Sequence, residues 1–87
     1  MSACRPHPAV IYTPLDETEA ILLHLDTKLY YTLNETGRRI WELAAGGQAP
    51  EAIAAALSAE YDVTVEHAEA RARTLIEEFA RERLLLR

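Results

Sequence analysis

The chain has 87 residues, of which 49% are apolar and 26% are charged, and this composition is typical of a folded domain rather than of a disordered chain. A chain of this size builds a thin core, so it has room for a groove or a free strand edge but little for an enclosed active site. The net charge is -5, from 9 basic and 14 acidic residues, which argues against nucleic acids and anionic membranes as partners.

The N-terminal residues have two prolines and no apolar periodicity. We therefore expect a flexible segment over residues 1–8 and a single domain over residues 9–87. Cys4 is the only cysteine, so an internal disulfide is excluded, and this thiol by itself does not indicate a catalytic or redox role. We expect a cytoplasmic protein, because the chain has no apolar run of membrane-spanning length and no signal-peptide pattern.

Three short segments have the composition of β-strands, at residues 9–13, 20–25 and 29–33. Polar turns at residues 16–19 and 26–28 separate them. These segments predict a three-stranded antiparallel meander, which needs a further layer packed on it to be stable.

In the third predicted strand, side chains alternate between the two faces of the sheet. Leu29, Tyr31 and Leu33 would share one face, and we expect Tyr31 to lie in the core. Tyr30 and Thr32 would point to the other face, where Tyr30 is either a surface residue or one that faces a ligand. If this strand is at the edge of the sheet, its free backbone groups could pair with an extended peptide.

After this strand the apolar period changes from two residues to 3.6, which predicts helices. Asn34 is a suitable N-cap for a first helix over residues 35–45, and Gly46 and Gly47 would end it. A second helix begins at Pro50, which suits the first turn of a helix.

A third helix begins after Thr64, again a suitable N-cap, and has the clearest helical pattern in the chain. The ending Leu-Leu-Leu-Arg at residues 84–87 forms either the frayed last turn of this helix or a short extension packed back on the sheet. Strands followed by helices (βββααα) predict an α+β fold in which the helices cover one face of the sheet.

The sequence does not indicate catalysis or a metal site. His7, His24 and His67 lie on three different segments without a metal-ligand spacing, and we expect structural or solvated roles for them. The glutamates of the third helix are interspersed with arginines, and pairs such as Glu69 with Arg73 have the spacing that modestly stabilises a helix. We therefore expect no enzyme activity, no cofactor and no metal.

The segment LNETGRRIW, residues 33–41, resembles the signature of the PqqD family, in which a strand ends in Leu-Asn and a Thr-Gly pair opens a helix. The second helix, the Glu-Tyr-Asp-Val joint at residues 60–63 and the long third helix ending in Leu-Leu extend the resemblance to about residues 9–86. The matching positions in the signature are Leu33, Asn34, Thr36, Gly37, Ile40 and Trp41.

The resemblance implies a winged helix-turn-helix-like fold and a role as a recognition element for ribosomally made, modified peptides. It implies that the leader of a precursor peptide adds as an antiparallel strand to the third strand, in a cleft closed by the third helix. The peptide-binding residues would then be Leu29, Tyr30, Tyr31, Thr32 and Leu33 on the strand and Arg71, Ala72, Leu75, Glu78 and Phe79 on the helix.

A short chain without a fused protease or cyclase is similar to the stand-alone leader-binding proteins of lasso-peptide clusters. The resemblance implies that such a protein presents the leader to a separate, transglutaminase-like cysteine protease and to a cyclase.

The alternative is a winged helix-turn-helix DNA-binding protein that reads DNA with its third helix. The arginines available for this are Arg71, Arg73, Arg81 and Arg83, but residues 64–87 carry as many acidic as basic groups.

Overall fold

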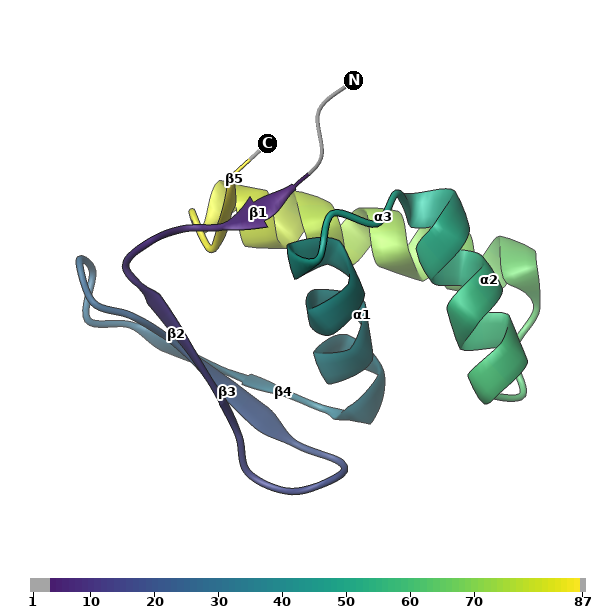
Figure 1. Ribbon diagram of the computed structural model, residues 1–87, viewed down its shortest axis with the longest axis horizontal. Helices are drawn as coiled ribbons and strands as arrows, with labels where there is room; N and C mark the ends of the chain where they lie inside the picture. Colours follow the sequence, from purple (N-terminus) through teal and green to yellow (C-terminus); the bar gives the residue numbers. More distant parts are fainter. Residues whose placement is uncertain (1–3, 87) are drawn as a thin grey trace.

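The structure is a computed structural model that describes residues 4–86, and these residues form five strands and three helices (Figure 1). In chain order they are β1 (Arg5–Pro6), β2 (Val10–Pro14), β3 (Ala20–His24), β4 (Tyr30–Leu33), α1 (Glu35–Ala45), α2 (Pro50–Glu60), α3 (Val65–Arg81) and β5 (Leu85–Leu86). The predicted α+β order of three strands followed by three helices is confirmed.

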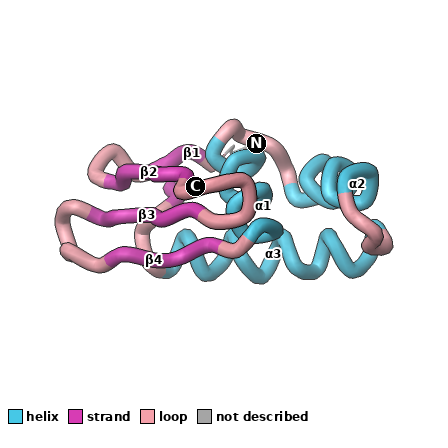
Figure 2. The backbone as a smooth tube through the Cα atoms, turned by 90° about the horizontal axis from the view of Figure 1, so that it is seen from below, coloured by secondary structure: helices cyan, strands magenta, loops and turns pink. Residues whose placement is uncertain are grey.

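The main sheet has the strand order β2-β3-β4 and is antiparallel throughout, so β2 and β4 are its two edges. Cross-strand pairs such as Leu22 with Tyr31 and Tyr12 with Leu22 place these three side chains on one face. α1 lies between the sheet and α2, and α3 runs past both α2 and α1 toward β5 (Figures 1 and 2). The helices therefore cover only one face of the sheet.

The predicted helix caps are confirmed. The Asn34 Oδ1 accepts a hydrogen bond from the Gly37 N–H at 2.8 Å, and the Thr64 Oγ1 accepts one from the His67 N–H at 3.2 Å. Such bonds satisfy N–H groups that have no partner inside the helix. After α1, Gly47 has a φ of 89°, a left-handed conformation that glycine adopts at little cost.

The core joins one face of the sheet to all three helices. Ala20 and Leu22 of β3 are completely buried, and they belong to the same apolar cluster as Ile40 of α1. Trp41 and Phe79 meet edge to face with their ring centroids 5.3 Å apart, a favourable arrangement for two aromatic rings that ties α1 to α3.

The N-terminal segment differs from the expected flexible lead-in, because Arg5–Pro6 form β1 and pair with Leu85–Leu86 of β5. The His7 N–H also donates to the Leu84 carbonyl at 3.0 Å. Of the two open possibilities for residues 84–86, the chain therefore forms a short extension, but it packs on the N-terminal segment rather than on the main sheet. Residues 1–3 of the expected flexible segment lie outside the described part.

The third strand is one residue shorter than predicted, because it begins at Tyr30 rather than at Leu29. Leu29 lies before β4 with 53% of its surface exposed. The β3–β4 hairpin extends beyond the helices (Figure 1), so no helix covers its tip. Within residues 4–86, no helix has the length and apolarity needed to span a bilayer.

Candidate peptide-binding edge

β4 is an edge strand, and only part of its backbone hydrogen-bonding capacity is used by β3. The His24 N–H donates to the Leu29 carbonyl at 2.9 Å, and the pairing continues in register along β4. In an antiparallel strand, alternate residues direct their N–H and C=O groups to the same neighbour. The backbone groups of Tyr31 and Leu33 and the carbonyl of Leu29 therefore face β3, whereas the Leu29 N–H donates to the Thr27 Oγ1 at 3.3 Å.

The same alternation leaves the backbone groups of Tyr30 and Thr32 pointing away from β3, toward the free edge. Each of these two residues offers one N–H donor and one C=O acceptor. An unpaired edge of this kind is a template for an additional strand. The backbone of β4 can thus accept an extended peptide without giving up a bond of the existing sheet.

The side chains of β4 alternate between the two faces as predicted. Tyr30 is 69% exposed and lies on the face that no helix covers, a position that is open both to solvent and to a ligand. Tyr31 faces the helices but is only half-buried, at the margin of the core. Its hydroxyl donates to the Glu82 Oε1 at 2.7 Å, and this hydrogen bond raises the pKa of Tyr31.

The bond from Tyr31 to Glu82 also joins β4 to the C-terminal end of α3, because Glu82 is the C-cap of this helix. Figure 2 shows β4 on the side of the sheet nearest to α3. The edge of β4 and the flank of α3 are therefore neighbours, which is the arrangement that the predicted cleft requires.

The five α3 residues predicted for the cleft fall into two groups. Ala72, Leu75 and Phe79 are buried at 0%, 8% and 4% exposure and belong to the apolar core. Arg71 and Glu78 are exposed on the surface of the helix. The buried group lies in the core behind the surface of the helix, whereas the exposed group can contact a ligand directly.

A pocket of about 320 Å³ lies beyond the end of β4, between the start of α1, the end of α2 and the start of α3. Of the predicted site residues, only Arg71 lines it. The other lining residues are Asn34, Thr36, Leu57, Tyr61, Asp62, Val63, His67 and Ala68. The sequence by itself predicts no site for these residues. Three of them, Tyr61, Asp62 and Val63, belong to the Glu-Tyr-Asp-Val joint that forms part of the family resemblance.

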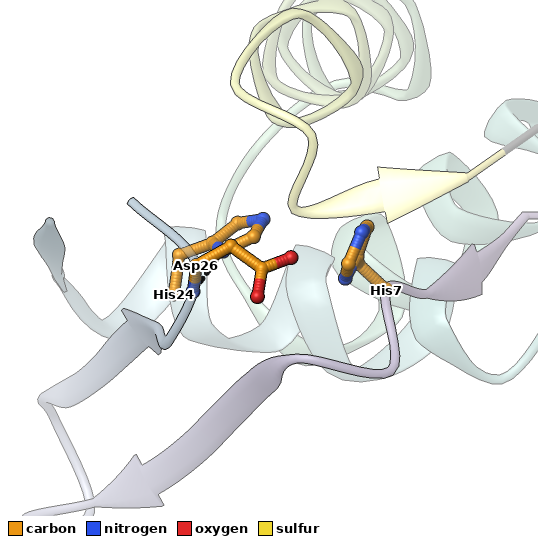
Figure 3. Close-up of side chains that lie close together, drawn as sticks. All are labelled: His7, His24 and Asp26. Carbon is orange, nitrogen blue, oxygen red and sulfur yellow. Dashed lines mark hydrogen bonds between the residues drawn. The ribbon is translucent and has the colours of Figure 1, made fainter. Parts of the chain in front are cut away.

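The structure also brings together two histidines that lie on separate segments of the sequence. The rings of His7 and His24 lie with their centroids 4.7 Å apart, and the carboxylate of Asp26 is close to both (Figure 3). No sequence spacing indicates this group, because its members come from the β1–β2 connection, the end of β3 and the following turn.

Comparison with known proteins agrees with this geometry. The family model described as "Coenzyme PQQ synthesis protein D (PqqD)" matches residues 19–85. No curated protein sequence matches the chain.

Two solved structures are similar to the chain. One is TbiB1 in complex with the TbiA(beta) leader peptide, with 37% sequence identity and a TM-score of 0.84 over 93% of each chain. The other is lasso peptide synthetase B1 complexed with the leader peptide, with 24% identity and a TM-score of 0.88 over 99% of this chain and 100% of that one; this likeness shows the fold. The family match covers most of the chain, and the chain belongs to the PqqD family.

Proposed function

We propose that this protein binds the leader region of a ribosomally made precursor peptide, of the lasso-peptide class, as an additional strand along β4. The observation that carries the proposal is the free edge of β4, where the backbone groups of Tyr30 and Thr32 point outward beside α3. The similarity to TbiB1, which was solved with a leader peptide, supports it.

The binding mode follows from the physics of a disordered peptide. A leader loses conformational entropy when it becomes ordered, and backbone hydrogen bonds along β4 with a few apolar contacts offset that loss. Leu29, Tyr30, Tyr31, Thr32 and Leu33 would form the strand side of the site. Arg71, Ala72, Leu75, Glu78 and Phe79 would form the helix side.

A proline at Thr32 tests the strand pairing. The Thr32 N–H points to the free edge, so Thr32→Pro removes a donor that the leader would use but that the sheet does not. We expect the labelled leader of a precursor encoded nearby to bind with micromolar or better affinity. We expect Thr32→Pro to raise the Kd about tenfold or more, since one lost hydrogen bond is worth about 1.4 kcal/mol here.

Thr32→Val is the matched control, because valine keeps the N–H and suits a strand equally well. Its Kd, measured by fluorescence anisotropy, should remain within about twofold of the wild-type value. Failure of the folded wild-type protein to bind any such leader would exclude the proposal. Equal affinities of the proline and valine variants would exclude pairing along β4.

The role of the protein after binding would be non-catalytic, namely to present the leader to a separate leader peptidase and to a cyclase. Presentation needs a contact surface that the bound leader leaves free. The uncovered face of the sheet provides an apolar row of Ile11, Leu23 and Tyr30, one from each strand. Ile11 is 47% exposed, and contiguous exposed apolar side chains are typical of protein contact sites. A leader on β4 would extend this face, so one partner could contact both.

Substitution on this face separates presentation from leader binding. Ile11→Lys should slow removal of the leader by the peptidase about tenfold while the Kd for the leader stays unchanged, since a lysine disfavours an apolar contact. Val65→Lys is the control, because Val65 is similarly exposed at 44% but lies at the start of α3. Equal cleavage rates for the two variants would contradict this role of the face.

A further inference from the structure

Three donor groups of the kind that bind transition metals converge at one end of the sheet (Figure 3). His7 lies between β1 and β2, His24 ends β3, and Asp26 lies in the turn that leads to β4. One ring nitrogen of each histidine and one carboxylate oxygen of Asp26 lie within 4.8 Å of one another. The three residues therefore face a common point, although each comes from a different segment.

The second observation is the state of the His24 ring. His24 is only 1% exposed, and its Nε2 is buried without a hydrogen-bond partner among residues 4–86. A buried polar atom without a partner is rare in folded proteins and requires an explanation, such as an ion. Burial of a polar atom without a hydrogen bond costs free energy, and an ion bound at this nitrogen would offset that cost.

We propose that His7, His24 and Asp26 bind one Zn²⁺ ion. Imidazole nitrogen and carboxylate oxygen are ordinary zinc ligands, whereas Mg²⁺ and Ca²⁺ prefer oxygen ligands alone. Three protein ligands leave the fourth tetrahedral position to a water molecule.

The group needs only a small contraction to reach zinc geometry. Two ligand atoms at about 2.1 Å from a tetrahedral ion are about 3.4 Å apart. The atoms here are at most 4.8 Å apart, so the required movement is no more than about 1.4 Å. Asp26 is exposed and lies in a turn, and its carboxylate can make most of this movement.

Zinc binding changes the hydrogen bonds of both rings. At present the Ala9 N–H donates to His7 Nδ1 at 2.9 Å and the Asp26 N–H donates to His24 Nδ1 at 3.2 Å. A ring that binds the ion through Nδ1 can no longer accept a hydrogen bond there. A ring that binds through Nε2 carries its proton on Nδ1, so its bond is lost as well. Loss of the longer bond also releases the backbone of Asp26 for the movement described above. A histidine that binds zinc usually donates a hydrogen bond from its other ring nitrogen, and this bond strengthens zinc binding. Here the backbone groups beside Nδ1 are donors rather than acceptors, so we expect a micromolar rather than a lower Kd.

Thermal unfolding of the whole chain tests the site. An ion that binds only the folded state raises the Tm, and with Zn²⁺ at 100 times its Kd we expect a rise of about 10 °C or more. Equal concentrations of Mg²⁺ should leave the Tm unchanged within about 1 °C. Calorimetric titration should give one ion per chain. Absence of a zinc-specific rise in the Tm would overturn the proposal.

Single substitutions test which residues bind the ion. Asp26→Asn and His7→Gln should each weaken zinc binding at least about tenfold, as removal of one ligand does. His67→Gln and Cys4→Ser are controls that remove other donors, an exposed histidine on α3 and the single thiol, and both should keep the wild-type Kd. Unchanged affinity in Asp26→Asn and His7→Gln, or loss of binding in either control, would assign the zinc to another place and overturn the proposal.

Discussion

Tyr12 shows how one side chain joins the sheet to the helices. Its hydroxyl donates to the Glu42 Oε2 at 2.7 Å, which connects β2 to α1, and its ring lies 6.4 Å from that of Trp41. Burial of the ring, followed by the hydrogen bond to Glu42 and the charge of that residue, raises the pKa of Tyr12 to about 12. The phenolate would have to form in a partly dry site beside a carboxylate, which is unfavourable.

An alkaline titration tests this contact. The pKa of Tyr12 in the folded chain lies above its ordinary value of 10.0, so the stabilisation is present below pH 10 and is lost as the pH rises through about 12. The absorbance rise of ionising tyrosine near pH 12 should be smaller in Tyr12→Phe by the contribution of one tyrosine. At pH 7 the variant should be less stable by about 1–2 kcal/mol in urea unfolding. An absorbance rise near pH 12 of equal size in the wild type and in Tyr12→Phe would contradict the assignment.

Arg39 and Glu60 form a two-bonded ion pair between α1 and the end of α2. The Arg39 Nε donates to Oε1 and the Nη2 to Oε2 of Glu60, both at 2.8 Å. These hydrogen bonds lower the pKa of Glu60 below its ordinary value of 4.5. The pair is partly exposed, so solvent weakens it and its contribution is modest.

The pH dependence of a Glu60→Gln variant tests this pair. A lowered pKa means that the stabilisation is present above the ordinary value of 4.5 and is lost as the pH falls through the lowered pKa. Urea unfolding should show a loss of about 0.5 kcal/mol at pH 7 that shrinks toward zero under acid conditions. A difference between variant and wild type that stays constant down to acid pH would argue against the ion pair.

At the scale of elements, the pairing of β1 with β5 connects the two ends of the described chain. It is antiparallel and aligns Pro6 with Leu85 and Arg5 with Leu86. Leu84 and Leu85 are 1% and 2% exposed and belong to the core. The pairing therefore closes the core at the C-terminal end of α3, next to the bond between Tyr31 and Glu82.

Truncation of the two β5 side chains should have unequal effects. Leu85→Ala creates a cavity in the core and should reduce the free energy of unfolding by about 2–4 kcal/mol. Leu86→Ala is the matched control, because Leu86 is only half-buried and should cost about 1 kcal/mol. Urea unfolding curves of both variants measure the difference. Equal losses would mean that β5 does not close the core as described.

At the scale of the whole molecule, shape and charge favour a peptide over DNA. The molecule measures 36 × 33 × 17 Å, so it is thin in one direction, as expected when helices cover only one face of a small sheet. The net charge is -5. Arg73, one of the four arginines available for DNA, is already paired with Glu51 at 2.6 Å and with Glu69 at 2.8 Å.

This charge distribution predicts weak or absent binding to duplex DNA. Contacts with phosphates need a basic surface, and non-specific DNA binders reach Kd values of about 1–100 µM at physiological salt. We expect that protein concentrations of about 1–100 µM do not raise the anisotropy of labelled duplex DNA, at either about 50 or about 150 mM salt. Under the same conditions the protein should raise the anisotropy of the labelled leader peptide. Retention of DNA that weakens steeply with salt would favour the alternative function.

Local rules in the sequence were enough to predict much of this protein. Asn34 and Thr64 cap their helices, and Glu69 pairs with Arg73, because each contact lies within one turn or two of the same helix. The change of apolar period after Leu33 marks the transition from strands to helices for the same reason. The order of elements and the resemblance to the PqqD family therefore followed from residues close together in the chain.

Only the tertiary structure decided how distant segments meet. Leu29 has the alternation of a core residue, yet it is exposed because the hairpin that carries it extends beyond the helices. The residues after α3 pair with the N-terminal segment, and His7 lies beside His24. Periodicity reports which face of an element is apolar, but not which other element covers it. Contacts between segments far apart in sequence depend on the packing of the whole chain, and this packing also determines that β4 keeps a free edge.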